Sequence, residues 1–510
     1  MVAERCKMDV KSRMVINGSR PSGPRALSCP AFGPNSEPRT PIRSPDAAKP
    51  VLLMSVSIGW AIRNFFQTGI VEKLRAHFDV VILATPRAGR HLRELGCDRG
   101  ITVRPIDVGE EPFRWKLFRQ ARKKVYLEGR SSATESIWEK YSRRPWYQKA
   151  GGRMIKAALR LSNGPGLYGA LERLDFKVNV DRRFAPLFPQ AKPAIYFATH
   201  ATTYFEECLL RNALASGLPV AFMILSWDHL SSKVFLNRHL DTILVWNPHT
   251  RQELLQTYPW YRPEQIKVVG IPQYDVYALP PEISYADWCR KYGLNPRRRT
   301  ILFSTMPQSR HEQQHIILEA LLREIDAGEK LPPDLQVLIK CHPFDNFPGY
   351  EVLTGRFHAG IHRSGLSERQ AQEDWAPQAS EIEASRDALY FCSLNINIFS
   401  TVTIEAAYFD KPIVHIAFDP HPVAGRIPCH EYYNHDHFRP IVQKGASLFA
   451  RSYAEFFDAI DRSLRDPGRL REQRQKLVQA FIGRRVGTAS FAVVEELIDM
   501  QRRLFKGRPP

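Results

Sequence analysis

The stretch Val51-Leu-Leu-Met-Ser-Val-Ser-Ile58 has the length and composition of a buried β-strand. Gly59 supplies a turn after it, and Trp60-Ala-Ile-Arg-Asn-Phe-Phe66 then begins a helix. A second apolar strand at 80–84 follows the helical pattern at 70–77. Because strand, helix and strand recur at this spacing, the sequence predicts a βαβ unit and hence a parallel sheet.

The same alternation continues along the chain and predicts an α/β fold of two tandem Rossmann-like domains. Further strands are expected at 101–106, 194–198, 219–225, 241–246, 266–270, 300–304, 336–340, 388–391, 396–398 and 412–416. Helices are expected at 204–216, 248–257, 310–325, 402–409, 452–464, 467–482 and 488–506. The predicted parts are a disordered, basic, Pro-rich tail (1–49), an N-terminal Rossmann-like domain (50–272) with a basic helical insertion (112–162), and a C-terminal Rossmann-like domain (273–510) with closing helices.

Composition excludes several classes of protein. Hydrophobic residues make up 44% of the 510 residues and charged residues 25%, as in ordinary globular proteins. No run of about 18 uncharged apolar residues predicts a membrane-spanning helix. The eight cysteines show no CxxC or paired spacing, which indicates thiols in a reducing compartment. No apolar leader follows the N-terminus, so a cytoplasmic protein is expected.

The formal net charge of +19 is concentrated in two segments. Residues 1–49 carry nine Lys/Arg against four Asp/Glu, and residues 114–160 carry fourteen against three. A nucleic-acid enzyme would more often carry its charge along the cleft, so no nucleic-acid partner is predicted. Two interpretations of the 112–162 insertion stay open. It is either a solvated helical hairpin whose aromatic residues pack on the domain, or a surface that binds an anionic membrane or another polyanion.

Polar residues follow three predicted strands of the second domain, where ligands bind in open parallel sheets. The candidates for donor and phosphate binding are Thr305, Gln308, His342, Ser400, Thr401 and Glu405. Free amides at the start of the helix after Thr401 suit a phosphate, and Glu405 could accept hydrogen bonds from a sugar. Each residue also has a structural interpretation, such as an N-cap for the Ser-Thr pair or a packing role for His342.

The first domain has polar residues at its own strand ends. The candidate general bases are His200, which follows the strand at 194–198, and Asp228 and His229, which follow the strand at 219–225. The structural alternatives are an N-cap for Asp228 and loop packing for His229. Three further residues are predicted to lie on the acceptor side: Gly59, Arg63 and Lys233.

Several motifs combine these positions into a pattern. The first domain contains SWDHLSSK at 226–233, VWN at 245–247 and VVGIPQYD at 268–275, and the second contains His342-Pro343, STVTIEAAYFDKPIV from Ser400 and GRRVGTAS at 483–490. In these motifs the chain resembles bacterial GT-B type glycosyltransferases that build surface polysaccharides. It is also similar to the wider group of CDP-glycerol glycerophosphotransferases, capsule Kdo transferases and bacterial sialyltransferases. The resemblance covers about residues 50–500 and leaves out the 112–162 insertion.

The resemblance implies transfer of a sugar from a nucleotide-sugar donor to a cell-surface glycan or a lipid-linked acceptor. It makes the N-terminal domain (50–272) the acceptor domain and the C-terminal domain (273–510) the nucleotide-donor domain. His342, Ser400 and Thr401 match the places where the family holds the donor phosphate. The Glu-Glu pair of retaining enzymes is absent after Phe399, which favours inversion, and the acidic trio of the related UDP-GlcNAc 2-epimerases is not recognisable. No DxD motif lies in a suitable loop, so neither a metal nor a cofactor is expected beyond the nucleotide-sugar co-substrate.

Two rival functions stay open beside sugar transfer. One is a CDP-polyol phosphotransferase, and the other is a non-catalytic basic protein that binds a membrane or a polyanion through residues 112–162. A lipid-linked acceptor would place the enzyme in the cytoplasm, peripheral to the inner face of the membrane. Polar loops at the strand ends of both domains favour an enzyme, because a non-catalytic binding protein does not need a cleft lined by polar residues from both domains.

Overall fold

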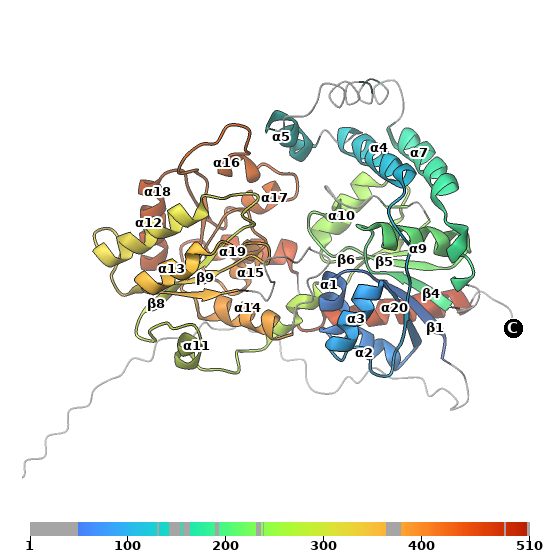
Figure 1. Ribbon diagram of the computed structural model, residues 1–510, viewed down its shortest axis with the longest axis horizontal. Coiled ribbons are helices and arrows are strands. Elements are labelled where there is room, and N and C mark those ends of the chain that lie inside the picture. The colour runs from blue at the N-terminus through green and yellow to red at the C-terminus, as the bar shows by residue number, and fades with distance from the viewer. Residues whose placement is uncertain are drawn as a thin grey trace, which may run out of the picture. The chain divides into compact units, whose positions relative to one another are not determined.

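The computed structural model describes residues 49–129, 132–141, 154, 157, 164–188, 193–230, 236–237, 239–363, 379–483 and 486–506. These residues belong to one compact unit. They form two all-parallel sheets flanked by helices, which confirms the predicted pair of Rossmann-like domains (Figure 1). The predicted tail at 1–49 lies outside the described residues except for Lys49.

The first sheet has the strand order β3-β2-β1-β4-β5-β6-β7. Its strands are β1 (Val51–Val56), β2 (Asp79–Ala84), β3 (Thr102–Pro105), β4 (Pro193–Ala198), β5 (Val220–Met223), β6 (Thr242–Val245) and β7 (Ile266–Val268). Leu52 and Met54 of β1 face one core and Leu53 faces another, so helices cover both sides of the sheet. The strand order reverses between β1 and β4, where doubly wound folds have their ligand crevice.

The second sheet has the order β10-β9-β8-β11-β12-β13. Its strands are β8 (Arg299–Ser304), β9 (Leu335–Lys340), β10 (Ala359–His362), β11 (Leu394–Asn397), β12 (Ile413–Ile416) and β13 (Leu448–Ala450). The prediction of a strand at 388–391 is wrong, because these residues end helix α14 (Ala379–Phe391). A run of four apolar residues fits a buried helix as well as a strand. The short edge strands β10 and β13 were not predicted.

The helices match the predicted alternation. In the first domain they are α1 (Gly59–Ala61), the π-helix η1 (Ile62–Phe66), α2 (Ile70–Arg75), α3 (Pro86–Glu94), α4 (Phe113–Gly129), α5 (Ala133–Tyr141), α7 (Gly164–Asn179), η2 (Arg182–Phe184), α9 (Tyr204–Ala215), α10 (Pro248–Thr257) and η4 (Pro263–Gln265). They continue with η5 (Pro272–Ala278), α11 (Tyr285–Lys291), α12 (Gln314–Ala327), α13 (Gly349–Arg356), α14, α15 (Val402–Tyr408), α16 (Cys429–Tyr432), α17 (Arg439–Val442), α18 (Tyr453–Arg465), α19 (Arg471–Phe481) and α20 (Ala489–Lys506).

Residues from two of the sequence motifs form hydrogen bonds with the C-terminal helices of the chain. Asp275 accepts hydrogen bonds from the amides of Gly487 (2.9 Å), Ala489 (3.0 Å) and Ser490 (2.8 Å) and so caps α20. Asn247 caps α10 and also donates to the carbonyl oxygen of Phe481 (2.9 Å). Helix α20 packs against α2 of the first domain, although the predicted second domain includes it.

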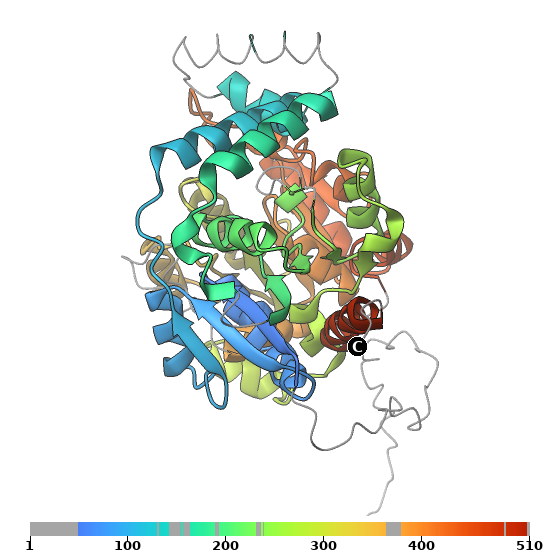
Figure 2. The ribbon, with the colours of Figure 1, turned by 90° about the vertical axis from the view of Figure 1, so that its right-hand side faces the viewer.

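The insertion at 112–162 is helical where the structure describes it. Helix α4 packs along α7, and the two lie side by side in both views (Figures 1 and 2). Trp115 is buried and donates to Glu207 (3.0 Å), and Arg122 forms a buried ion pair with Asp175 (2.7 Å). The packing interpretation therefore holds for these two side chains. Apart from residues 154 and 157, the part from 142 to 162 lies outside the described residues.

Candidate functional site

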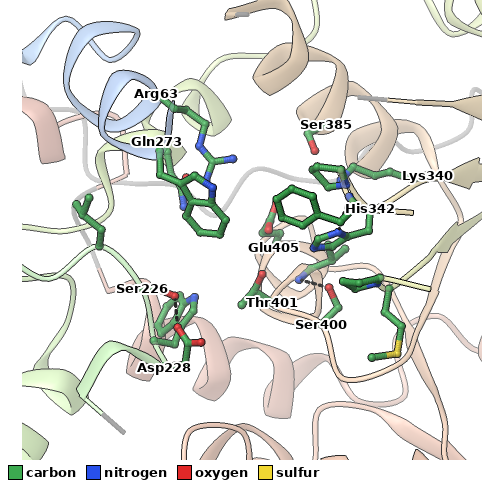
Figure 3. A pocket seen from close by; sticks show the side chains of 18 of the residues that line it. Arg63, Ser226, Asp228, Gln273, Lys340, His342, Ser385, Ser400, Thr401 and Glu405 are labelled. Carbon is green, nitrogen blue, oxygen red and sulfur yellow. Dashed lines mark hydrogen bonds between the residues drawn. The ribbon is translucent and has the colours of Figure 1, made fainter. Parts of the chain in front are cut away.

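A cavity of about 360 Å³ lies where the carboxyl ends of the two sheets meet. This volume is in the range of roughly 300–1,000 Å³ that is typical of small-molecule sites. Loops after β1, β5 and β6 form one side of it, and loops after β8, β9 and β11 form the other. Seven of the residues singled out from the sequence line the cavity: Arg63, Asp228, Thr305, His342, Ser400, Thr401 and Glu405. Figure 3 labels all of them except Thr305.

His342 presents a hydrogen-bond donor to the cavity. Its Nδ1 accepts the amide hydrogen of Phe344 (3.1 Å), so the proton of the neutral ring lies on Nε2. Burial, together with the smaller effect of the nearby cations Lys340 and Arg310, lowers the pKa of His342 to about 3. Its backbone amide donates to Thr305 Oγ1 (2.9 Å). Thr305 thereby fixes the loop that carries the imidazole, in addition to lining the cavity.

Two cations beside His342 were not among the predicted site residues. Lys340 is the last residue of β9, and Arg310 lies in the loop after β8; both line the cavity. Burial lowers the pKa of Lys340, while Glu405 acts in the opposite direction. Among the residues that the structure describes, no carboxylate lies within ion-pair distance of either cation. This wall of the cavity is therefore suited to an anion.

The Ser-Thr pair precedes α15 as predicted, but the amides there are already used. Ser400 Oγ accepts from the amide of Val402 (3.3 Å), and the carbonyl oxygen of Ser400 accepts from the amide of Thr403 (3.1 Å). The expectation of free amides at these positions is wrong. Ser400 is thus the residue that caps the helix, whereas the exposed Thr401 side chain makes no capping bond.

Phe399, directly before this pair, has a backbone φ of 44°. A left-handed conformation costs a non-glycine residue about 1–2 kcal/mol. The aromatic rings of Tyr432 (5.4 Å) and Phe438 (4.8 Å) pack against the Phe399 ring and hold it in this conformation. Strain of this kind clusters at functional sites, and here it fixes the position of the Ser400 backbone in the cavity wall.

Glu405 is buried at the centre of the cavity. Its Oε2 accepts a hydrogen bond from Tyr277 of the interdomain segment η5 (2.5 Å). Arg63, from the first domain, also lies close enough to interact electrostatically with Glu405 (Figure 3). Burial lowers the pKa of Arg63, and the negative charge of Glu405 opposes this shift. The Glu405 carboxylate therefore lies where the two domains and their linker meet.

Asp228 lies on the wall opposite Ser400 and Thr401 (Figure 3). Ser226 Oγ donates a hydrogen bond to Asp228 Oδ1 (2.6 Å). Both residues follow β5 and are half-buried. A hydrogen-bonded carboxylate facing the cavity can accept a proton from a hydroxyl group bound there.

His200 and His229 do not line the cavity. His200 is 1% exposed, and its Nε2 lies 3.2 Å from Ser57 Oγ and 3.4 Å from Glu206 Oε1. Burial lowers the pKa of His200 to about 3 and raises that of Glu206 to about 7, so the ring is neutral at pH 7. His229 is buried, and its Nδ1 accepts from the amide of Leu225 (3.4 Å). Both imidazoles therefore lie outside the cavity lining and make hydrogen-bond contacts within the neighbouring polar loops.

The remaining predicted residues lie elsewhere. Gly59 is buried at the start of α1, and Gln308 is a half-buried turn residue outside the cavity lining. Lys233 lies outside the described residues. The structure thus brings together seven of the twelve candidates at one cavity.

Within the described part of the chain, one group of side chains has the spacing of metal ligands. The ligand atoms of His311, Asp419 and Cys429 lie within 4.8 Å of one another, and His311 and Asp419 line a hollow that Arg310 also lines. His311 Nε2 and the Cys429 amide already contact the Asp419 carboxylate, at 3.3 and 3.0 Å. These contacts hold the loops together without an ion, and the group does not line the main cavity.

Two groups stand out among the cavity residues missed by sequence reasoning, which also include Gln273, Glu381 and Ser385. Lys340 and Arg310 lie at or after strand ends, as His342 and Thr305 do, so the same rule could have identified them from the sequence. The aromatic lining has no such signal, because buried aromatic residues are common in any core. It consists of Trp60, Trp227, Trp246, Tyr274, Tyr277, Phe344 and Phe399.

Comparison with solved structures identifies the fold. A structure assigned as a UDP-N-acetylglucosamine 2-epimerase from Listeria monocytogenes aligns with 91% of this chain and 99% of its own at a TM-score of 0.52 and 12% identity. The S. aureus MnaA–UDP co-structure aligns with 90% and 99% at a TM-score of 0.50 and 12% identity. MurG from Acinetobacter baumannii aligns with 89% and 100% at a TM-score of 0.44 and 14% identity.

Neither a family model nor a curated protein sequence matches the chain. At 12% identity the first two structures show the fold alone. The chain has the GT-B fold, with two Rossmann-like domains in tandem. None of the helices in the described part of the chain combines the length and apolarity that crossing a membrane requires.

Proposed function

We propose that this protein is a GT-B type glycosyltransferase that transfers a sugar from a nucleotide-sugar donor, with inversion and without a metal ion. The acceptor would be a cell-surface glycan or a lipid-linked sugar. The observation that carries the proposal is the arrangement of the cavity walls. An anion-binding wall with Lys340, Arg310 and His342 faces the Asp228 carboxylate, and the two walls come from different domains.

This arrangement supports both halves of a transfer reaction. The Nε2–H of His342 and the cations Lys340 and Arg310 would stabilise negative charge on the leaving diphosphate. Glu405 would orient the sugar or ribose hydroxyls between them. On the opposite wall, Asp228 would accept the proton of the acceptor hydroxyl as that oxygen attacks the anomeric carbon. The carbon–oxygen bond to the diphosphate breaks, and the nucleoside diphosphate leaves.

The test is a thermal-unfolding panel with UDP, GDP, CDP, ADP, dTDP and CMP, first without metal and then with magnesium. A ligand at 100 times its Kd stabilises the fold by about 2.7 kcal/mol, which is a readable shift. We expect one nucleoside diphosphate to stabilise the protein without magnesium. No stabilisation by any nucleotide would contradict the proposal and favour the non-catalytic binding protein.

Product analysis then separates the remaining reactions of such a site. We expect the product to contain the transferred sugar and no phosphorus in the new bond. Phosphorus in that bond would identify a CDP-polyol phosphotransferase. The structure assigned as a UDP-N-acetylglucosamine 2-epimerase suggests a second candidate for this fold, epimerisation of the nucleotide-sugar itself. In that case the donor would change configuration at C2 in the absence of any acceptor.

We also propose that helices α4 and α7 contact an anionic membrane surface. Four large apolar side chains of these helices are exposed: Phe113 (79%), Leu117 (56%), Leu174 (51%) and Val178 (38%). Exposed cations on the same two helices include Arg114, Lys116, Arg173 and Lys177. Such binding requires apolar side chains that enter the membrane interface and neighbouring cations that contact the lipid phosphates.

The expected result is co-sedimentation with vesicles that contain phosphatidylglycerol and much weaker binding to pure phosphatidylcholine. Replacing Phe113 and Leu117 together by Ser should reduce binding to the anionic vesicles. Val352→Ser, at an exposed apolar residue of α13 (59% exposed), is the matched control and should bind as the wild type does. Equal binding of all three proteins would rule out α4 as the membrane contact.

A further inference from the structure

Helix α5 belongs to the insertion of the first domain, but its first turn is held by the second domain. The Asp436 carboxylate accepts hydrogen bonds from Ser132 Oγ (2.6 Å) and from the amides of Ala133 (3.1 Å) and Thr134 (3.1 Å). The Asp436 amide donates to Thr134 Oγ1 (3.0 Å) in return. An anionic cap at a helix N-terminus contributes about 1 kcal/mol. The cap fixes this end of α5 to the loop after α16 (Figure 1).

The rest of α5 is docked on the same domain. Ile137 is 7% exposed and belongs to the hydrophobic core of the second domain, with Trp138 and Tyr141 packed against it. At the C-terminal end, Lys140 Nζ (2.7 Å) and Tyr141 OH (3.0 Å) contact the Glu431 carboxylate. Helix α5 thus links the two domains independently of the segment η5.

Trp138 connects this docked helix to the proposed donor site. The guanidinium of Arg310 lies over the Trp138 ring, 5.3 Å from its centroid, and Arg310 lines the cavity. The Arg310 backbone carbonyl also accepts a hydrogen bond from Tyr432 of α16 (3.2 Å). Because no carboxylate among the described residues pairs with Arg310, the indole ring is the group that restricts its position.

We infer that α5 is a positioning element, in which Trp138 holds the Arg310 guanidinium against the diphosphate of the bound nucleotide. The inference rests on the proposed function, since it requires an anionic ligand in the cavity. It also explains why the insertion reaches the second domain. A first-domain helix that orders a phosphate ligand of the second domain makes the donor site depend on the contact between the domains.

The test measures the affinity for inorganic pyrophosphate and for the nucleoside diphosphates of the panel in the wild-type protein and in five variants. Trp138→Ala should weaken binding about two- to fivefold, the factor that an exposed cation–π contact is worth. Trp138→Phe should restore most of the loss, because a phenyl ring still offers a π face. Arg310→Ala should weaken binding by about tenfold or more, because it removes charge-assisted hydrogen bonds. Ser136→Ala, at an exposed position of α5, should bind as the wild type does.

The decisive protein carries both Trp138→Ala and Arg310→Ala. If Trp138 acts through Arg310, the double variant binds no more weakly than Arg310→Ala alone. Additive losses, or wild-type affinity in Trp138→Ala, would overturn the inference while leaving the proposed function intact. Failure of the wild-type protein to bind any of these ligands would overturn both. Thermal unfolding without ligand identifies a loss that arises from undocking of α5, because that loss lowers the melting temperature as well.

Discussion

Replacing Asp228 by Asn should lower kcat for sugar transfer by about 10²–10⁴-fold, the range that a positioned general base contributes. Asparagine keeps the volume of the side chain and can still accept the hydrogen bond from Ser226, but it cannot take up a proton. The wall proposed to bind the diphosphate lies on the other domain, so nucleotide affinity should change little. Release of nucleotide from the donor measures kcat, and thermal unfolding with nucleotide measures binding.

Ser226→Ala is the matched control for this variant. It removes the 2.6 Å hydrogen bond to Asp228 and leaves the carboxylate, so the expected loss is no more than about tenfold. Retained kcat in Asp228→Asn would show that the residue is not the base, and because His200 and His229 do not line the cavity, no predicted base would then remain in contact with it. A lowered melting temperature without ligand would instead support a structural role for Asp228 in its loop.

The fold was predictable because parallel strands buried on both faces produce apolar runs that are visible in one sequence. β1 is the clearest case, with Leu52, Leu53 and Met54 all fully buried. The error at 388–391 has the same origin, since Ala388 and Leu389 are fully buried in a helix. Burial produces the apolar run, but the run does not specify which backbone conformation is buried.

The sequence predicted only those site residues whose position at a strand end places them beside the cavity. The strand-end rule placed Thr305, His342 and Asp228 at one cavity, but it could not show that His200 turns away from that cavity into a network with Ser57 and Glu206. Side-chain direction depends on packing between β1 and α9, which no local pattern contains. The docking of α5 on Asp436 is a contact between residues about 300 positions apart, and it too has no local signal.

Lys340→Met should weaken nucleotide binding by about 10- to 150-fold and at the same time leave the free protein equally or more stable. The loss follows because charge-assisted hydrogen bonds contribute about 1.5–3 kcal/mol each. The gain follows because burial lowers the pKa of Lys340 and no carboxylate of the described residues forms an ion pair with it. Methionine has a similar length and needs no hydration. Calorimetric titration with the nucleotide and thermal unfolding without it measure the two effects.

The control is Lys411→Met, because burial also lowers the pKa of Lys411 and this residue does not line the cavity. It should leave nucleotide affinity unchanged, so a loss specific to Lys340 reports the site and not the cost of removing a half-buried lysine. The pH dependence gives a second check. Only the protonated amine binds phosphate strongly, so affinity should fall as the pH rises through the lowered pKa of Lys340, and Lys340→Met should lack this step. If Lys340→Met instead lowers the melting temperature and retains nucleotide affinity, the ammonium serves to balance the charge of Glu405, and the anion-binding role falls to Arg310 and His342.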